Sequence, residues 1–103
     1  MHLDDVTKRS EDTYTCVIRR SGIQGRALVR KQALAPWRGA YEMDLYGGKE
    51  RGGPMGHKQR QLANDLALEA KGNLARALYT AGWSSEQRAY AGRTYILWHA
   101  PQS

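Results

Sequence analysis

The sequence predicts an α+β fold, an antiparallel sheet of about four strands (β-β-β-α-β) with one long helix packed on one face. Apolar and polar side chains alternate over residues 13–19 and 41–46, which is typical of half-buried strands. Residues 57–81 contain no proline and are rich in Ala, Leu, Gln, Lys and Arg, the composition of a helix. A chain of 103 residues can bury one modest core, so we expect a single domain over residues 1–103.

The N-terminal third is expected to form an arm and a hairpin. Residues 1–11 are mixed in charge and without period, which predicts a flexible arm. The strand over 13–19 leads into residues 21–25, where two glycines are spaced as in a short hairpin loop. Residues 26–34 combine aliphatic side chains with cations and can return as the antiparallel partner.

A turn, a strand and a glycine-rich loop precede the helix. Residues 36–39 (Pro-Trp-Arg-Gly) have the composition of a turn, since proline sets one dihedral angle and glycine frees another. The strand over 41–46 follows. Residues 47–56 contain five glycines and open directly into the helix, so we expect a glycine-rich loop there.

The helix is expected to bury a stripe of small and aliphatic residues and to end at Gly82, a left-handed C-cap. The stripe consists of Ala63, Leu66, Ala67, Ala70, Leu74, Ala77, Leu78 and Ala81. Alanines imply a close approach to the sheet, while Gly72-Asn73 is expected to loosen the middle of the helix. Residues 83–86 have the pattern of a turn, and residues 93–99, apolar on both faces, that of a central strand or of one covered on both sides.

Composition excludes several classes of protein. The single cysteine, Cys16, excludes an internal disulfide and is expected to be a small buried hydrophobe. No apolar stretch approaches the roughly 20 residues that span a bilayer, and the first residues lack a signal-peptide pattern, so we expect a soluble, cytoplasmic protein without a membrane partner. His2, His57 and His99 are dispersed, which predicts no metal site. No catalytic motif and no cofactor site can be read from the sequence.

Positive charge is concentrated in the first half of the chain. The net charge is +6, and residues 19–60 alone hold ten Lys and Arg against three acidic residues, a net charge of +7. This balance favours an anionic partner, namely nucleic acid, a nucleoprotein complex or an acidic protein surface. The candidate binding residues are Arg19, Arg26, Arg30, Lys31, Trp37, Arg38, Lys49, Arg51, Lys58 and Arg60.

The loop 47–56 is a candidate anion site, because backbone N–H groups and the helix dipole favour negative charge at a helix start. It contains neither a Walker A string nor a dinucleotide fingerprint. Residues 51–56 (Arg-Gly-Gly-Pro-Met-Gly) resemble the pyrophosphate loop of GNAT acetyltransferases, with Pro54 where that pattern has a glycine. The resemblance covers this loop alone and implies a coenzyme A site in a fragment of such an enzyme. The same residues are also compatible with a loop that contacts phosphate and with a mobile charged loop.

The sheet offers a second candidate surface. Arg19 and the cations of the next strand would form a basic face beside aromatic rings, which suits single-stranded nucleic acid. Glu42 and Asp44, on the outward side of the third strand, would instead neutralise these arginines if the strands are neighbours. Both interpretations are open at this point.

Two functions from different classes follow. The first is a small non-enzymatic protein that binds nucleic acid or a nucleoprotein complex through residues 19–60. The second is an inhibitor or adaptor that docks on a protein through Trp37, expected to be partly exposed, and its neighbouring cations. Small basic α+β chains without a catalytic motif are common among phage and mobile-element proteins, anti-CRISPR proteins included, and the likeness is one of type. A homodimer through the uncovered sheet face is a further expectation.

The least neutralised cations form a smaller set around the turn, the loop and the helix start. They are Arg38, Lys49, Arg51, Lys58 and Arg60. The sequence therefore predicts that these five residues form one cationic cluster.

Overall fold

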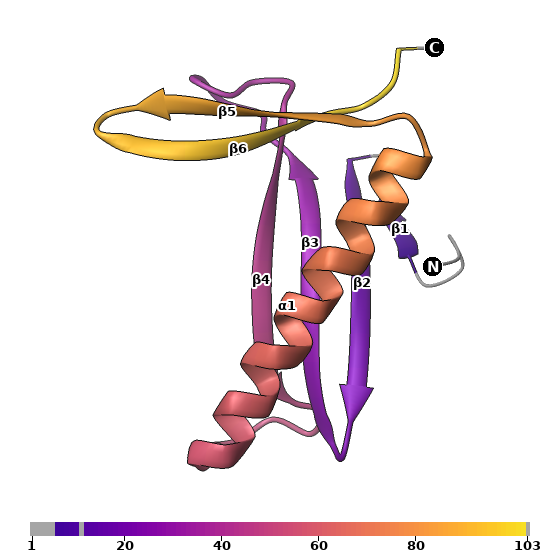
Figure 1. Cartoon of the computed structure of the whole chain (residues 1–103), viewed down its shortest axis with the longest axis vertical. Helices are drawn as coiled ribbons and strands as arrows, with labels where there is room; N and C mark the ends of the chain where they lie inside the picture. Colours follow the sequence, from indigo (N-terminus) through magenta and orange to yellow (C-terminus); the bar gives the residue numbers. More distant parts are fainter. Residues whose placement is uncertain (1–5, 11, 103) are drawn as a thin grey trace.

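The chain forms one antiparallel sheet with a helix against it (Figure 1). The computed structural model describes residues 6–10 and 12–102, and side chains from residue 12 on. The elements are β1 (Val6–Ser10), β2 (Thr13–Arg20), β3 (Ile23–Lys31), β4 (Tyr41–Lys49), α1 (His57–Thr80), β5 (Ser84–Tyr90) and β6 (Arg93–His99). The six strands lie in the order β1-β2-β3-β4-β6-β5. The predicted α+β class is confirmed, with more strands than the four expected.

The helix α1 crosses β2, β3 and β4 on one face of the sheet (Figure 1). The buried residues of the helix are Ala63, Leu66, Ala67, Ala70, Leu74, Ala77 and Leu78, as the stripe predicted, whereas Ala81, also in the stripe, is the exposed C-cap. Gly82 has a φ of 95°, as expected after a helix end. Gly72 does not interrupt the helix, since α1 continues unbroken from His57 to Thr80. Burial of the residues on either side outweighs the cost of one glycine, about 1 kcal/mol.

Two strand glycines lie directly beneath α1. A Cβ atom on Gly25 would stand 2.0 Å from the backbone nitrogen of Ala67, and one on Gly47 would stand 2.9 Å from the Cβ of Ala63. Gly25 therefore belongs to β3, and the sequence interpretation that placed it in the hairpin loop is wrong. The turn between β2 and β3 consists of Ser21-Gly22 alone. Gly25 is needed where it is because no other residue allows the helix backbone so close.

Two segments that lacked a strand pattern are strands. Val6–Ser10 pairs with β2, so the prediction of a flexible arm is wrong for these residues, while residues 1–5 and 11 lie outside the described residues. Ser84–Tyr90, whose first residues were expected to form a turn, is β5 and pairs along its whole length with β6. Both strands lie at edges of the sheet, where backbone pairing with one neighbour is sufficient and apolar alternation is not required.

The β5–β6 hairpin stands out from the rest of the sheet. It meets β4 at a single register pair, Tyr41↔Trp98, then crosses the upper end of β4 and extends past its edge (Figure 1). Leu97 and Trp98 are buried, whereas Ile96 is 48% exposed. The prediction that this strand is covered on both faces therefore holds only near its C-terminal end.

The main core lies between α1 and the sheet. It includes Cys16, Val29, Leu74, Trp83 and Trp98, which confirms the prediction that the cysteine is buried. The helix is 24 residues long. Among the described residues, neither α1 nor any other helix is apolar enough over a sufficient length to cross a membrane.

Candidate functional site

The structure divides the candidate cations between the two ends of the sheet. β3 and β4 are antiparallel strands of nine residues each. Lys31 is the last residue of β3, and Arg38 lies in the turn beyond this end of the sheet, whereas Lys49 and Arg51 lie at the opposite end. Nine residues of strand separate the two ends by about 27 Å. The predicted five-residue cluster is therefore brought together only in part, because Arg38 lies far from the others.

Three of the arginines share the sheet face that α1 leaves uncovered. Gly25 faces α1, and side chains alternate along a strand, so Arg26 and Arg30 point to the other face. Arg19 of β2 joins them, since its register partner is on the same face as Arg26. Lys31 falls on the helix side and does not belong to this surface.

Acidic side chains lie on the same uncovered face. Glu42 is the direct register partner of Arg30, and Asp44 lies on the same side of β4. Glu50 lies 3.4 Å from the Nε of Arg19. On β2 to β4, three arginines therefore stand beside three carboxylates, and the described pair within ion-pair distance is Arg19 with Glu50. The structure favours the mixed-charge interpretation of the sheet over the cationic one.

Arg26 is the arginine on this face that contacts an aromatic ring. Its guanidinium carbon lies 4.9 Å from the ring centroid of Tyr46, and the tyrosine is 45% exposed. The Nε of Arg26 is buried and has no hydrogen-bond partner among the described residues. The pairing of guanidinium and ring expected from the sequence is thus present at Tyr46, whereas the ring of Trp37 has the guanidinium carbon of Arg88 at 5.6 Å from its centroid.

Trp37 is buried, contrary to the sequence interpretation. Its side chain is 8% exposed, and its ring centroid lies 5.3 Å from those of both Tyr90 and Tyr95. The turn that carries Trp37 is covered by the β5–β6 hairpin, whose first strand had no sequence signature. An exposed tryptophan anchor for docking on a protein is therefore not present at this turn.

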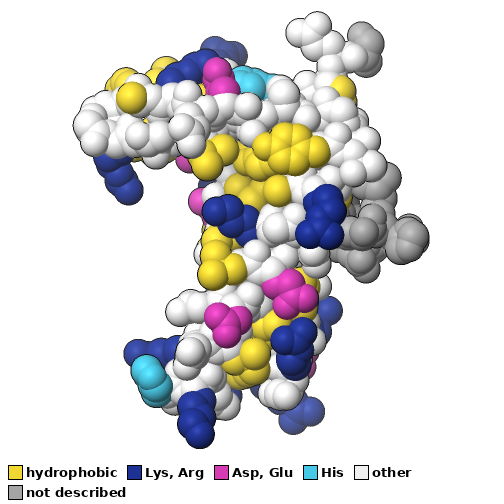
Figure 2. Space-filling view, in the orientation of Figure 1, with side chains coloured by type: hydrophobic (Ala, Val, Ile, Leu, Met, Phe, Trp, Pro, Cys, Tyr) yellow, Lys and Arg dark blue, Asp and Glu magenta, His cyan; other side chains and the backbone are white. Residues whose placement is uncertain are grey.

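A cationic tip lies at the lower end of the molecule, where dark blue side chains gather in Figure 2. We use this name for Lys49 at the end of β4, Arg51 in the following loop, and Lys58 and Arg60 at the start of α1. Lys49 is partly exposed and the other three are exposed. Within the described part of the chain none of the four forms an ion pair. The neighbouring Glu50 pairs with Arg19 instead. Residues 47–49 belong to β4, so the loop itself is shorter than expected.

The start of α1 has no negative charge to stabilise it. The N-cap is Gly56, whose N–H donates to Oε1 of Gln59 at 3.0 Å. The first turn contains no acidic residue and instead carries His57, Lys58 and, just after it, Arg60. The positive end of the helix dipole is unfavourable for cations, so these residues weaken the helix start. A bound anion would relieve both the unpaired N–H groups and the repulsion between cations.

A shallow cavity of about 250 Å³ opens beside the tip. Lys49, Arg51, Gly52 and Gln59 contribute to its lining, together with the turn between β2 and β3. The N–H of Gly52 donates to the carbonyl oxygen of Lys49 at 3.1 Å, which closes the start of the loop into a turn. The carboxylate of Glu50, 3.4 Å from the Nε of Arg19, lines the cavity as well, so a phosphate group there would meet two cations and one paired carboxylate.

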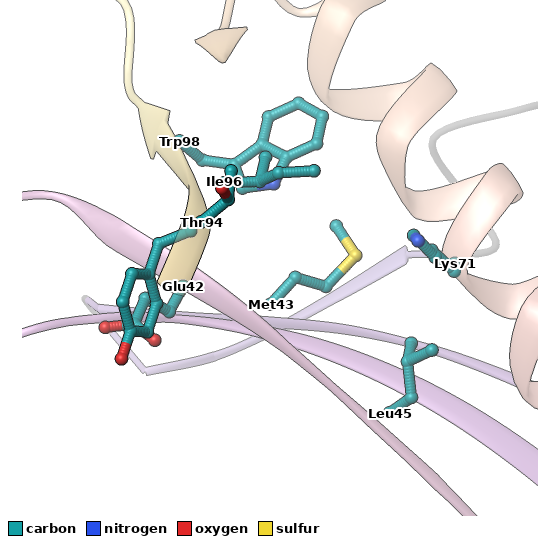
Figure 3. Close-up of a pocket in the computed structure, with 8 residues that line it drawn as sticks. Glu42, Met43, Leu45, Lys71, Thr94, Ile96 and Trp98 are labelled. Carbon is teal, nitrogen blue, oxygen red and sulfur yellow. The ribbon is translucent and has the colours of Figure 1, made fainter. Parts of the chain in front are cut away.

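A second feature had no counterpart in the sequence interpretation, and we call it the edge groove. It runs along the outer edge of β4, between the hairpin and α1, where Figure 2 shows the molecule hollowed and yellow side chains gathered. Its upper part, in Figure 3, is a cavity of about 250 Å³ between Met43 and Leu45 of β4, Lys71 of α1, and Ile96 and Trp98 of β6.

The lower part of the edge groove is a cavity of about 310 Å³ that begins at Leu45 and passes Gly47, Asn64 and Leu68. One sequence signal for it existed. Leu68 lies off the apolar stripe of α1 and is 58% exposed, and it lines the same cavity as the exposed Leu45.

Comparison with known proteins identifies no relative. No protein-family model, no curated protein and no solved structure matches this chain.

Proposed function

We propose that this protein is a small non-enzymatic binding protein whose cationic tip engages nucleic acid, free or within a nucleoprotein complex. The observation that carries the proposal is the separation of charge. The cations of the sheet face stand among carboxylates, whereas Lys49, Arg51, Lys58 and Arg60 converge on one end without an ion pair in the described residues.

The chemistry of the tip suits phosphate. Lysine and arginine bind phosphate oxygens, and a helix start adds backbone N–H groups that point at the same anion. Gly52 and Gly53 have φ angles of 73° and 97°, which lets the loop backbone present its groups in directions closed to other residues. Contacts of this kind read the phosphate backbone rather than base sequence, so we expect binding with little sequence preference. A nucleic-acid partner also fits the cytoplasmic location expected from the sequence.

The remaining functions suggested by the sequence have less support. A pyrophosphate loop depends on successive free N–H groups, whereas Pro54 has none and the N–H of Gly52 is bonded within the loop. Docking on a protein through Trp37 lacks its exposed anchor, because the indole is buried. An inhibitor of phage or mobile-element type is compatible with the tip only as a protein that binds a nucleoprotein target.

Fluorescence anisotropy with a labelled 20-nucleotide single strand, titrated at several salt concentrations, tests the proposal. The tip variant replaces Lys49, Arg51, Lys58 and Arg60 by glutamine. A matched control removes the same charge elsewhere on the surface by replacing Lys31, Arg38, Arg76 and Arg93 by glutamine.

The wild type should bind with an affinity that falls steeply as salt rises, because phosphate binding releases counterions. The tip variant should bind at least about tenfold more weakly at low salt, with a log–log salt slope smaller by about 3. The control variant should lose much less affinity. Equal losses in both variants would mean that net charge alone attracts the strand, and no binding by the wild type would reject the proposal.

A further inference from the structure

The outer edge of β4 carries backbone groups that no described strand pairs. The N–H of Glu50 donates to the carbonyl oxygen of Gly22 at 3.0 Å, which shows which residue pairs between β3 and β4 are hydrogen-bonded. Bonded and non-bonded pairs alternate in antiparallel strands, and the register of β3 and β4 has no shift. The even-numbered residues of β4 therefore bond to β3. The N–H and C=O groups of Met43, Leu45 and Gly47 point outward into the edge groove.

Apolar side chains surround these outward groups. Leu45, Leu68 and Ile96 are 39%, 58% and 48% exposed, and all three line the groove. A strand added to β4 places the residues opposite Met43, Leu45 and Gly47 on the α1 side, next to these apolar groups. A Cβ on Gly47 would stand 2.9 Å from the Cβ of Ala63, so α1 itself borders the groove at this end.

Charge in the groove is asymmetric. Lys71 reaches from α1 toward Met43 in the upper cavity (Figure 3), is exposed, and has no ion pair in the part of the chain that the structure describes. Glu42 lines the same cavity from the side of the hairpin. A carboxylate on the occupant is therefore complementary to the α1 side of the groove and is repelled from the hairpin side.

The room along the edge fits one short strand. The hairpin crosses the upper end of β4, the N-terminal half of α1 lies over its lower end (Figure 1), and Tyr41 already pairs with β6. The outward groups from residue 43 to residue 47 span about 13 Å, the length of a five-residue extended segment. A second folded copy that paired its own β4 here would push its loop 50–56 against the hairpin.

We propose that the edge groove binds an extended segment of a partner protein, which pairs with β4 as an added strand. The segment has apolar side chains at alternate positions and a carboxylate that meets Lys71. This mode of recognition combines main-chain hydrogen bonds with pockets for every second side chain. The edge groove is a surface separate from the cationic tip, so a failure of the nucleic-acid proposal and a failure of this one can be distinguished.

Peptides selected from a phage-displayed library of random 12-residue segments on the immobilised protein provide the test. Enriched peptides should show alternating apolar residues with one acidic residue. The best peptide, synthesised and added to the isotope-labelled protein, should slow amide hydrogen exchange at Met43, Leu45 and Gly47. The amides of Asp44 and Tyr46 should not change, because they already bond to β3.

Two variants test the side-chain contacts. Leu45→Asp should weaken binding of the selected peptide at least about tenfold, whereas the exposed control Leu34→Asp should change it less than about twofold. The library selected on the immobilised Lys71→Glu variant should enrich a basic residue where the wild type enriched an acidic one. Selection on the Arg76→Glu variant should enrich the same acidic residue as the wild type.

Three results would overturn the proposal. The first is that no peptide is enriched, and the second is that the alternate amides of β4 gain no protection when a peptide binds. The third is that the protein is a dimer in solution with these amides already protected, which would make a second copy the occupant.

Discussion

The part of the molecule under α1 and the β5–β6 hairpin are stabilised in different ways. Under α1, strands share long registers, and the helix backbone touches the sheet closely enough that Gly25 has no space for a methyl group. The hairpin shares one register pair with β4, and its base is held by rings, Trp37 against Tyr95 and Tyr79 against Trp98. Close packing therefore fixes the first part, and a few aromatic contacts fix the second.

The largest effect is expected where the helix meets the sheet. Gly25→Ala would place a methyl group on the backbone of α1, which cannot move aside like a side chain, and should cost about 3 kcal/mol or more of unfolding free energy. Gly48→Ala is the control, since a Cβ there meets nothing within 4 Å, and should change stability by less than about 0.5 kcal/mol. Urea denaturation measures both. Equal stability of the two variants would show that the helix is not held as closely as described.

A smaller and local effect is expected at the base of the hairpin. Trp37→Ala removes the ring that packs against Tyr90 and Tyr95 and should cost about 3 kcal/mol, mainly as local opening of β5 and β6. Hydrogen exchange should then accelerate in the hairpin while β2 and β3 keep their protection. Tyr46→Ala, on the uncovered face, should leave the hairpin amides unchanged. Equal acceleration in β2 would mean that the two parts unfold as one.

The smallest effect is a pH dependence of the hairpin. Glu86 on β5 pairs with His99 on β6 at 3.0 Å and with Arg88, and the hydrogen bond to His99, assisted by Arg88, lowers the pKa of Glu86 below 4.5. A carboxyl group with a lowered pKa stabilises the fold above its ordinary pKa, and this contribution is lost as pH falls through the lowered value. The hairpin should therefore weaken only below about pH 4.5.

An NMR titration of the Glu86 carboxyl carbon and the His99 ring measures this effect. Glu86→Gln should remove the acid-dependent step in the hairpin signals. The control Glu69→Gln removes an ion pair with Arg20 in the part under α1 and should leave the step unchanged. An unchanged step in Glu86→Gln would assign it to another group.

The fold under α1 could be predicted because burial leaves a period in the sequence. The alanine stripe of the helix lies on its buried face, and the alternation in β2 and β4 places Cys16 and Tyr41 in the core beneath α1. The hairpin could not be predicted in the same way, since Ser84–Tyr90 is mostly exposed and carries no alternation. Missing that strand also caused the wrong prediction for Trp37, because its burial depends on rings contributed by the hairpin.

The two candidate sites differ in the same respect. Counting charges along the sequence found the cationic tip, because its four residues are near one another in the chain. Excluding Arg38 from it required knowing the direction of the strands. The edge groove joins β4, the middle of α1 and β6, and it exists because the hairpin leaves the sheet at Tyr41↔Trp98. No local pattern encodes that angle.

The free edge of β4 also bears on aggregation. An exposed strand edge with apolar neighbours normally invites other chains to add one after another, the route by which fibrils grow. Here the hairpin above and the helix below limit the edge to a short single strand (Figure 1). So short an edge favours one extended segment over the edge of a whole sheet, which limits growth of the sheet at β4.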